Sequence, residues 1–208
     1  MNIELQPPFP LVKEFLPKIK NGLVLDIGSG NGRNSIFLAQ NNFKVESFDI
    51  NNKNVKEIKK LATDLHLKIN SKKNDVLKFE FKPQKYDLIL AIQSLIWMKK
   101  SDFKKVIKKI KNGLKIDGVA IISGFTVKDR SYLNLKSVKN PISKNTFYSK
   151  SEKRYWQFLD KQELKKYFNK DFKVLYYKEK LIKETKHKGI AGHHNHGIAE
   201  IVVRRIKK

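Results

Sequence analysis

The chain has 208 residues, which suits one α/β domain with its own hydrophobic core and is too short for two domains of ordinary size. Hydrophobic residues make up 40% of the sequence, which excludes wholesale disorder. Cysteine is absent, which excludes disulfide frameworks, thiolate nucleophiles and cysteine-ligated metals. The net charge of +25 keeps nucleic-acid binding open as a function.

The positive charge comes mainly from lysine, since only five of the 45 cationic residues are arginine. Proteins that read phosphates and bases rely on arginine forks, so this composition favours a general lysine bias over dedicated RNA binding. No run approaches the roughly 20 apolar residues of a membrane-spanning helix. The first residues also lack the basic and apolar regions of a secretory signal. We therefore expect a cytoplasmic protein with no membrane partner.

Strand-like and helix-like periodicity alternate along the chain. The first half of the chain predicts a helix at 10–20, a strand at 23–27, a helix at 34–40, a strand at 43–49, a helix at 55–65 and a short strand at 67–69. The second half predicts strands at 86–92, 119–122, 172–177 and 198–203. It also predicts a helix at 101–113 capped by Ser101, and a helix that begins in a capping box of Asp160 and Glu163. No helix separates the last two strands. This order predicts an α/β fold: an open, mostly parallel, doubly wound sheet with an antiparallel C-terminal edge strand.

A glycine-rich loop joins the first strand to the following helix. Gly28, Gly30 and Gly32 alternate with other residues, which permits a tight turn and the close approach of a ligand. This spacing differs from the dinucleotide fingerprint and from a P-loop. Asp26 ends the first strand, where it is placed to meet an ammonium group. Asp49 ends the second strand, where a carboxylate accepts hydrogen bonds from both hydroxyls of a ribose.

The sequence Asp-Ile-Gly-Ser-Gly-Asn-Gly-Arg-Asn at 26–34 resembles motif I of Rossmann-like (class I) S-adenosylmethionine-dependent methyltransferases. Its Gly-Arg-Asn ending is similar to the tellurite-resistance-type subgroup of small-molecule methyltransferases. The resemblance extends to Pro-Pro-Phe-Pro at 7–10, Asn-Asp-Val at 74–76, Tyr-Asp-Leu-Ile at 86–89 and the final hairpin. It implies a Rossmann-like methyltransferase fold with S-adenosyl-L-methionine as cofactor. The cofactor-binding residues that we predict are Asp26, Gly28, Gly30, Gly32, Asp49, Ile50, Asp75, Val76 and Gln93.

We expect the chain to form a single methyltransferase domain over residues 1–208. Its predicted parts are the N-terminal helix at 10–20, the cofactor-binding core at 22–125, a cap over the substrate site at 126–159, and the final helix and hairpin at 160–208. The segment 131–159 lacks clear periodicity, and a stretch of this length inside a domain is usually functional or mobile. Its aromatic side chains either shape an acceptor pocket or cover the edge of the sheet.

Four of the five histidines fall within ten residues, in the loop between the last two strands. This loop is expected at the ligand-binding edge of the sheet. Three interpretations stay open. His193, His194 or His196 acts as a general base on the acceptor; His187, His194 and His196 bind a divalent metal, with Glu184 or Glu200; or the loop binds an anion or simply caps the site.

The leading hypothesis is direct, in-line methyl transfer to a small-molecule acceptor, either an anion or a soft chalcogen species. Gln93, Ser94 and Trp97 follow the central strand and are candidates for the acceptor site. One alternative is an RNA or protein methyltransferase that uses its basic surface to hold the substrate. The other is a non-catalytic protein of the same fold that binds a nucleoside or a metal.

Overall fold

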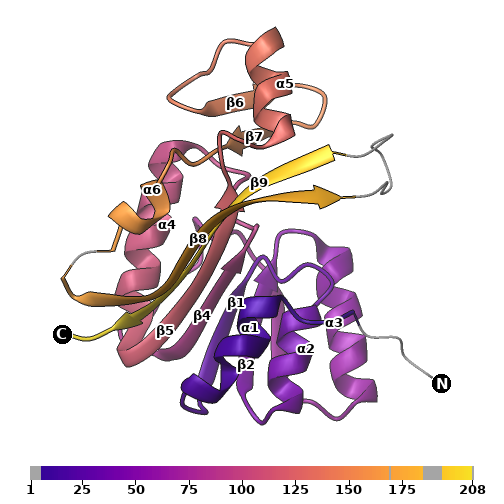
Figure 1. Cartoon of the computed structure of the whole chain (residues 1–208). Helices are drawn as coiled ribbons and strands as arrows, with labels where there is room; N and C mark the ends of the chain where they lie inside the picture. The colour runs from indigo at the N-terminus through magenta and orange to yellow at the C-terminus, as the bar shows by residue number, and fades with distance from the viewer. Residues whose placement is uncertain (1–5, 169, 185–193, 208) are drawn as a thin grey trace.

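In the computed structural model, which describes residues 6–168, 170–184 and 194–207, seven strands form the main sheet in the order β3-β2-β1-β4-β5-β9-β8 (Figure 1). The strands are β1 (Leu23–Ile27), β2 (Lys44–Asp49), β3 (Ile69–Lys73), β4 (Tyr86–Ile92), β5 (Leu114–Phe125), β8 (Phe172–Glu184) and β9 (His194–Arg205). The first five are parallel, and β9 is antiparallel to both of its neighbours. The expected fold class is confirmed. Because β9 is inserted between β5 and β8, the penultimate strand forms the outer edge.

Helices cover both faces of this sheet (Figure 1). The helical elements of the described residues are α1 (Pro10–Phe15), the 3-10 turn η1 (Leu16–Lys18), α2 (Arg33–Gln40), α3 (Asn52–Asp64), α4 (Lys100–Gly113), α5 (Arg130–Val138) and α6 (Glu163–Lys166), of which α5 lies beyond the carboxyl edge of the sheet. Neighbouring strand residues point to opposite faces. Val24 and Leu88 therefore pack with α1 and α2, whereas Leu25 and Ile89 pack with α4 and α6. The carboxyl ends of the strands are left open at one edge.

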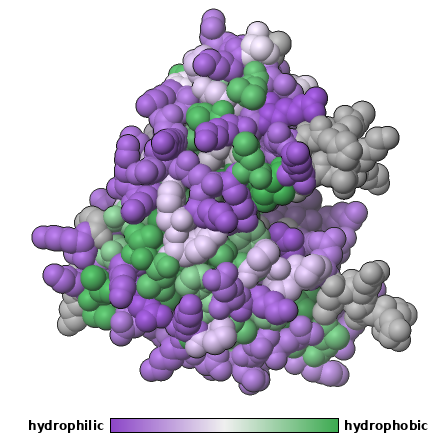
Figure 2. Space-filling view, in the orientation of Figure 1, coloured by the Kyte–Doolittle hydropathy of each residue, from purple (hydrophilic) through white to green (hydrophobic). Residues whose placement is uncertain are grey.

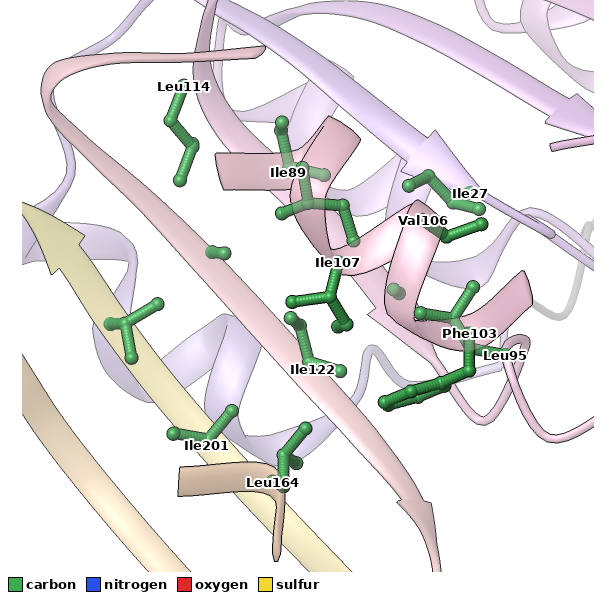
Figure 3. Close-up of a cluster of buried hydrophobic side chains, with 14 of the residues drawn as sticks. Ile27, Ile89, Leu95, Phe103, Val106, Ile107, Leu114, Ile122, Leu164 and Ile201 are labelled. Carbon is green, nitrogen blue, oxygen red and sulfur yellow. The ribbon is translucent and has the colours of Figure 1, made fainter. Parts of the chain in front are cut away.

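The larger core lies between the sheet and α4. Phe103, Val106 and Ile107 of this helix recur at helical spacing and are buried. They lie against Ile89 and Ile122 of the two central strands (Figure 3). The apolar runs at 88–92 of β4 and 119–122 of β5 are the strand segments that the sequence identifies most clearly, since both of their faces are covered.

Several predicted boundaries are wrong. The third strand starts at Ile69, where the prediction of 67–69 ends, because β3 is mostly polar. The N-cap of α4 is Lys99 and not Ser101, and no side chain caps that helix. The capping box forms only in half: Glu163 Oε2 accepts a hydrogen bond from the Asp160 N–H at 2.9 Å, but Gln162 is the N-cap of α6. The Asp160 carboxylate instead binds the amide of Asn145 at 2.7 Å.

The segment without clear periodicity is ordered. It contains α5 and a separate hairpin of β6 (Thr146–Ser149) and β7 (Arg154–Gln157), which project from the carboxyl edge of the main sheet (Figure 1). Asp129 caps α5, since its Oδ1 accepts a hydrogen bond from the Ser131 N–H at 2.8 Å. Strands of four residues are too short to leave a recognisable alternation in the sequence.

The surface is strongly hydrophilic. Figure 2 shows hydrophilic residues over most of one face, with scattered hydrophobic ones between them. None of the helices in the described part of the chain has the length and apolar character needed to cross a membrane.

Candidate active site

A cavity of about 620 Å³ opens at the carboxyl ends of β1, β2 and β4. Parallel α/β sheets bind their ligands at this edge. The cavity is lined by the glycine loop, by the ends of the three strands and by the turn that leads into β7. The lining residues are Ile27, Gly28, Gly30, Phe48, Asp49, Ile50, Asn54, Asn74, Asp75, Val76, Leu77, Gln93, Ser94, Leu95, Trp97, Met98, Lys153, Arg154 and Tyr155.

The glycine loop forms one wall of this cavity in a conformation that favours glycine. Gly28 and Gly30 have φ angles of +65° and +54°. A Cβ added to Gly28 would lie 2.6 Å from the Cβ of Ser94, whereas a Cβ on Gly30 would meet no atom within 4 Å. The space in front of Gly30 is therefore open for a ligand that approaches the backbone closely.

Asp49 is buried at the end of β2 and holds the glycine loop in place. Its Oδ2 accepts a hydrogen bond from the Gly30 N–H at 2.8 Å, and its Oδ1 accepts one from the Asn51 N–H at 2.8 Å. Each carboxylate oxygen can accept a further hydrogen bond. The carboxylate is thus fixed in the cavity wall and retains the capacity to bind two hydroxyl groups.

Residues next to Asp49 in the cavity form the rest of the predicted cofactor-binding site. Ile50 lines the cavity and is 70% exposed, so its side chain is available to a flat apolar ligand lying against it. Asp75 shapes the turn after β3, where its Oδ1 accepts a hydrogen bond from the Leu77 N–H at 2.9 Å. Val76 and Gln93 also line the cavity. Seven of the nine predicted cofactor residues therefore lie together.

The other two, Asp26 and Gly32, are not among the lining residues. Asp26 is almost completely buried, and its Oδ2 accepts a hydrogen bond from Ser35 Oγ at 2.7 Å. Burial disfavours the charged carboxylate and raises the pKa of Asp26 to about 6, against the lowering effect of the Ser35 hydrogen bond. A buried acid with a shifted pKa behind the glycine loop is typical of a functional site.

Aromatic and cationic side chains form the opposite wall. The guanidinium of Arg154 lies over the Trp97 ring, with its Cζ 3.7 Å from the ring centroid. Trp97 in turn contacts Trp156 edge to face, at a centroid distance of 4.4 Å. Glu152 holds the arginine from the other side, since its Oε1 accepts a hydrogen bond from Arg154 Nη2 at 2.8 Å. This hydrogen bond with Arg154 is also the main reason that the pKa of Glu152 is lowered.

His196, near the start of β9, is not among the residues that line the cavity. Its Nδ1 is 2.8 Å from Oδ2 of Asp129, which is completely buried. A carboxylate accepts hydrogen bonds, so Nδ1 is the donor when Asp129 is ionised. The His196 ring stacks on Phe125 at 5.3 Å, and Phe125 stacks on Trp156 at 6.5 Å. Ring contacts therefore connect His196 with the cavity wall.

Comparison with known families identifies the chain. The sequence profile of the family described as "Methyltransferase domain" matches residues 18–172. The chain belongs to this methyltransferase family. The predicted enzyme class is thus confirmed, and the carboxyl-edge cavity is the candidate active site of a methyltransferase.

Individual relatives agree with this assignment. The methyltransferase is 33% identical over 131 residues to ribosomal protein L11 methyltransferase of Dictyoglomus turgidum, a match covering 61% of this chain and 40% of the relative. Its fold is similar to that of TehB from Haemophilus influenzae, with a TM-score of 0.75, 21% identity, and coverage of 96% of this chain and 62% of the other. An S-adenosylmethionine-dependent methyltransferase from Methanosarcina mazei gives 0.76 at 18% identity, covering 98% and 100%. The chain thus spans less than two thirds of the length of the first two of these relatives.

The S-adenosylmethionine-dependent methyltransferase fold implies binding of S-adenosylmethionine or S-adenosylhomocysteine, and the cavity fits such a ligand. Gly30 leaves open space beside the backbone, and Asp49 offers a fixed carboxylate for a ribose. Ile50 and Val76 offer apolar surface beside Asp75 for an adenine. These individual roles remain predictions.

The structure describes only some of the histidines that we predicted as catalytic or metal-binding residues. His187 and His193 lie outside the described residues, and His194 is described as the first residue of β9 without its side chain. No group of three or more metal-ligating side chains occurs among the residues that the structure describes. Glu200 is buried and paired with Lys180 Nζ at 2.7 Å. The metal site therefore remains a prediction.

Sequence reasoning missed Asp129 and Lys153. Asp129 precedes a helix by one residue, which is the position of an N-cap, but its pairing with His196 spans 67 residues and leaves no local signal. Lys153 lies in the turn before β7 with a φ angle of +52° and lines the cavity. A lysine in a chain this rich in lysine has no distinguishing signal.

Proposed function

We propose that this methyltransferase transfers a methyl group from S-adenosylmethionine to a small-molecule acceptor by direct in-line displacement. The observation that carries the proposal is the single cavity of about 620 Å³ that joins the glycine loop and Asp49 to the aromatic wall at Trp97. Its volume is in the range typical of small-ligand sites. The turn at 153–155 contributes to the lining, which favours a small acceptor over a large folded one.

The protein's role in this reaction is mainly to position and to exclude water. When bound, S-adenosylmethionine supplies a methyl group on a sulfonium sulfur, and the carbon–sulfur bond breaks with its electron pair left on sulfur as the acceptor atom bonds to the carbon. Gly28 and Gly30 leave room for close approach, and Asp49 fixes the ribose. The apolar side chains Trp97 and Met98 exclude water from the reacting atoms.

We propose that His196 takes up the acceptor's proton from a position outside the cavity lining, to which ring contacts through Phe125 and Trp156 connect it. The carboxylate of Asp129 beside Nδ1 would stabilise the imidazolium that forms on proton transfer. The carboxylate is also bound by the backbone N–H groups of Ser131 and Gly197, at 2.8 Å and 3.2 Å. The pair is therefore rigid, as a positioned base requires.

The test is calorimetric titration with S-adenosylmethionine and S-adenosylhomocysteine, followed by transfer of labelled methyl to a panel of small molecules. Asp49→Ala should weaken cofactor binding at least about tenfold, because both ribose hydroxyls lose a charged acceptor. Asp64→Ala removes the same charge from the exposed end of α3 and serves as the matched control. Equal affinities in the wild type and both variants would contradict the assignment of Asp49.

A second candidate function is methylation of a protein, which the 33% identity to ribosomal protein L11 methyltransferase favours. The net charge of +25 would then attract an acidic protein substrate, and it would attract an RNA substrate in the same way. Incorporation of labelled methyl into the protein or RNA fraction of a lysate, but not into small molecules, would select this function. We also propose kinship with the tellurite-resistance-type subgroup, on the Gly-Arg-Asn ending of motif I at 32–34 and the likeness in fold to TehB.

A further inference from the structure

The charges along the cavity wall are separated. Asp49 and Asp75 lie at the end formed by β2 and the turn after β3, whereas Lys153 and Arg154 come from the turn into β7. The acidic end belongs to the predicted cofactor site. We take the cationic end, which comes from a different segment of the chain, as the side of the methyl acceptor.

Arg154 is held in place at this end before any ligand binds. Its guanidinium stacks on Trp97 at 3.7 Å and lies 5.4 Å from the centroid of Trp156. The bond from Nη2 to Glu152 is the one hydrogen bond of the guanidinium within the described residues. A planar guanidinium fixed on an aromatic ring loses little entropy when it binds a second anion, and its fork matches the geometry of a carboxylate.

Two polar groups of the same cavity wall have no partner. Among the described residues, Ser94 Oγ and Arg154 Nε are shielded from solvent and make no hydrogen bond. Both residues line the cavity. A buried polar group without a partner is unfavourable, and a ligand with several oxygen lone pairs becomes a partner for these groups once a side-chain movement exposes them to the cavity.

The remaining lining at this end is apolar. Leu95 and Met98 are buried, and Trp97 and Tyr155 are half-buried. Such a surface suits the hydrocarbon or aromatic body of an organic molecule better than a small inorganic oxyanion.

We infer that the methyl acceptor is an organic acid whose carboxylate binds Arg154, with Ser94 as a second donor. This inference rests on the proposed function, because it takes the acidic end of the cavity as the cofactor site. The carboxylate is a binding group here. It places the acceptor with its body against Trp97 and its negative charge in the field of Lys153 and Arg154.

The test uses the two tryptophans of the chain as reporters, since both Trp97 and Trp156 contact Arg154. Tryptophan fluorescence is titrated with benzoate and with its neutral isostere benzamide, with and without saturating S-adenosylhomocysteine. We expect saturable quenching by benzoate, with binding about tenfold tighter than for benzamide, and a loss of about tenfold in benzoate affinity in Arg154→Gln. Lys139→Gln removes the same charge from an exposed position outside the cavity and should leave benzoate binding unchanged.

Three results would overturn the inference: no saturable quenching by benzoate, equal binding of benzoate and benzamide, or equal effects of Arg154→Gln and Lys139→Gln. The affinity for S-adenosylhomocysteine, measured by calorimetry on the same variants, separates this outcome from failure of the proposed function. Unchanged nucleoside affinity in Arg154→Gln also shows that the variant is folded. A wild-type protein that binds S-adenosylhomocysteine but not benzoate would refute the proposed class of acceptor and leave the cofactor assignment unchanged.

Discussion

The buried carboxylate of Asp26 destabilises the folded protein at neutral pH, so Asp26→Asn should make the chain more stable. The folded-state pKa is raised from 3.8 to about 6, mainly by burial. A shift of this size corresponds to roughly 3 kcal/mol of unfolding free energy. Asparagine is close in shape, carries no charge and keeps an oxygen that accepts the hydrogen bond from Ser35.

The sign of the pH dependence follows from the raised pKa. The folded protein binds the Asp26 proton more tightly than the unfolded chain does, so this contribution to stability is fully present below about pH 4 and is lost as pH rises through about 6. The advantage of Asp26→Asn should therefore be small near pH 4 and approach about 3 kcal/mol at pH 7.

Urea unfolding followed by circular dichroism at several pH values between 4 and 7.5 measures this difference. Asp64→Asn makes the same chemical change at an exposed position and should have little effect at any pH. A difference between wild type and Asp26→Asn that does not change with pH, or a variant that is less stable at pH 7, would contradict a destabilising role for the buried carboxylate. Weaker cofactor binding by the stabilised variant would show why the acid is kept.

Two further predictions concern the active site. Asp129→Asn removes the charge beside His196, the residue that we propose as the base, so kcat should fall about tenfold or more, while calorimetry with S-adenosylhomocysteine shows an unchanged affinity; a kcat equal to wild type would contradict the assignment. Gly28→Ala places a Cβ 2.6 Å from Ser94 at a φ angle of +65°, so thermal unfolding should show a loss of at least about 1–2 kcal/mol. Gly30→Ala, which has the same strain but no clash, should lose less stability and act on cofactor binding, and equal losses for the two would argue against the steric explanation.

The parts of the fold that sequence predicts well are those with a strong local pattern. β4 and the segment 119–122 of β5 were predicted from apolar runs that are covered on both faces, and α4 shows clear helical spacing, whereas the more polar start of β5 at 114–118 was not predicted. The edge strand β3 consists mostly of polar residues, so its hydrophobic signal is weak and its position was wrong. The short strands β6 and β7 hold four residues each, which is too few for any periodicity to appear.

The same distinction applies to the candidate site. Gly28, Gly30 and Asp49 could be predicted because each follows a strand directly, and the topology of a parallel sheet brings such turns together. The pair of Asp129 and His196 could not, because it depends on the antiparallel pairing that sets Phe125 of β5 opposite Ile198 of β9. Tertiary pairing of this kind leaves no mark in a local pattern.

The insertion of β9 between β5 and β8 has a consequence for how the chain acquires its structure. One edge of β5, the longest of the parallel strands, stays unpaired until the segment 198–204 has been synthesised. An open apolar strand edge is a template for pairing with other chains. A nascent chain whose central strands pair before β9 is available would leave this edge unprotected, and chaperone binding should then be strongest before the last strand leaves the ribosome.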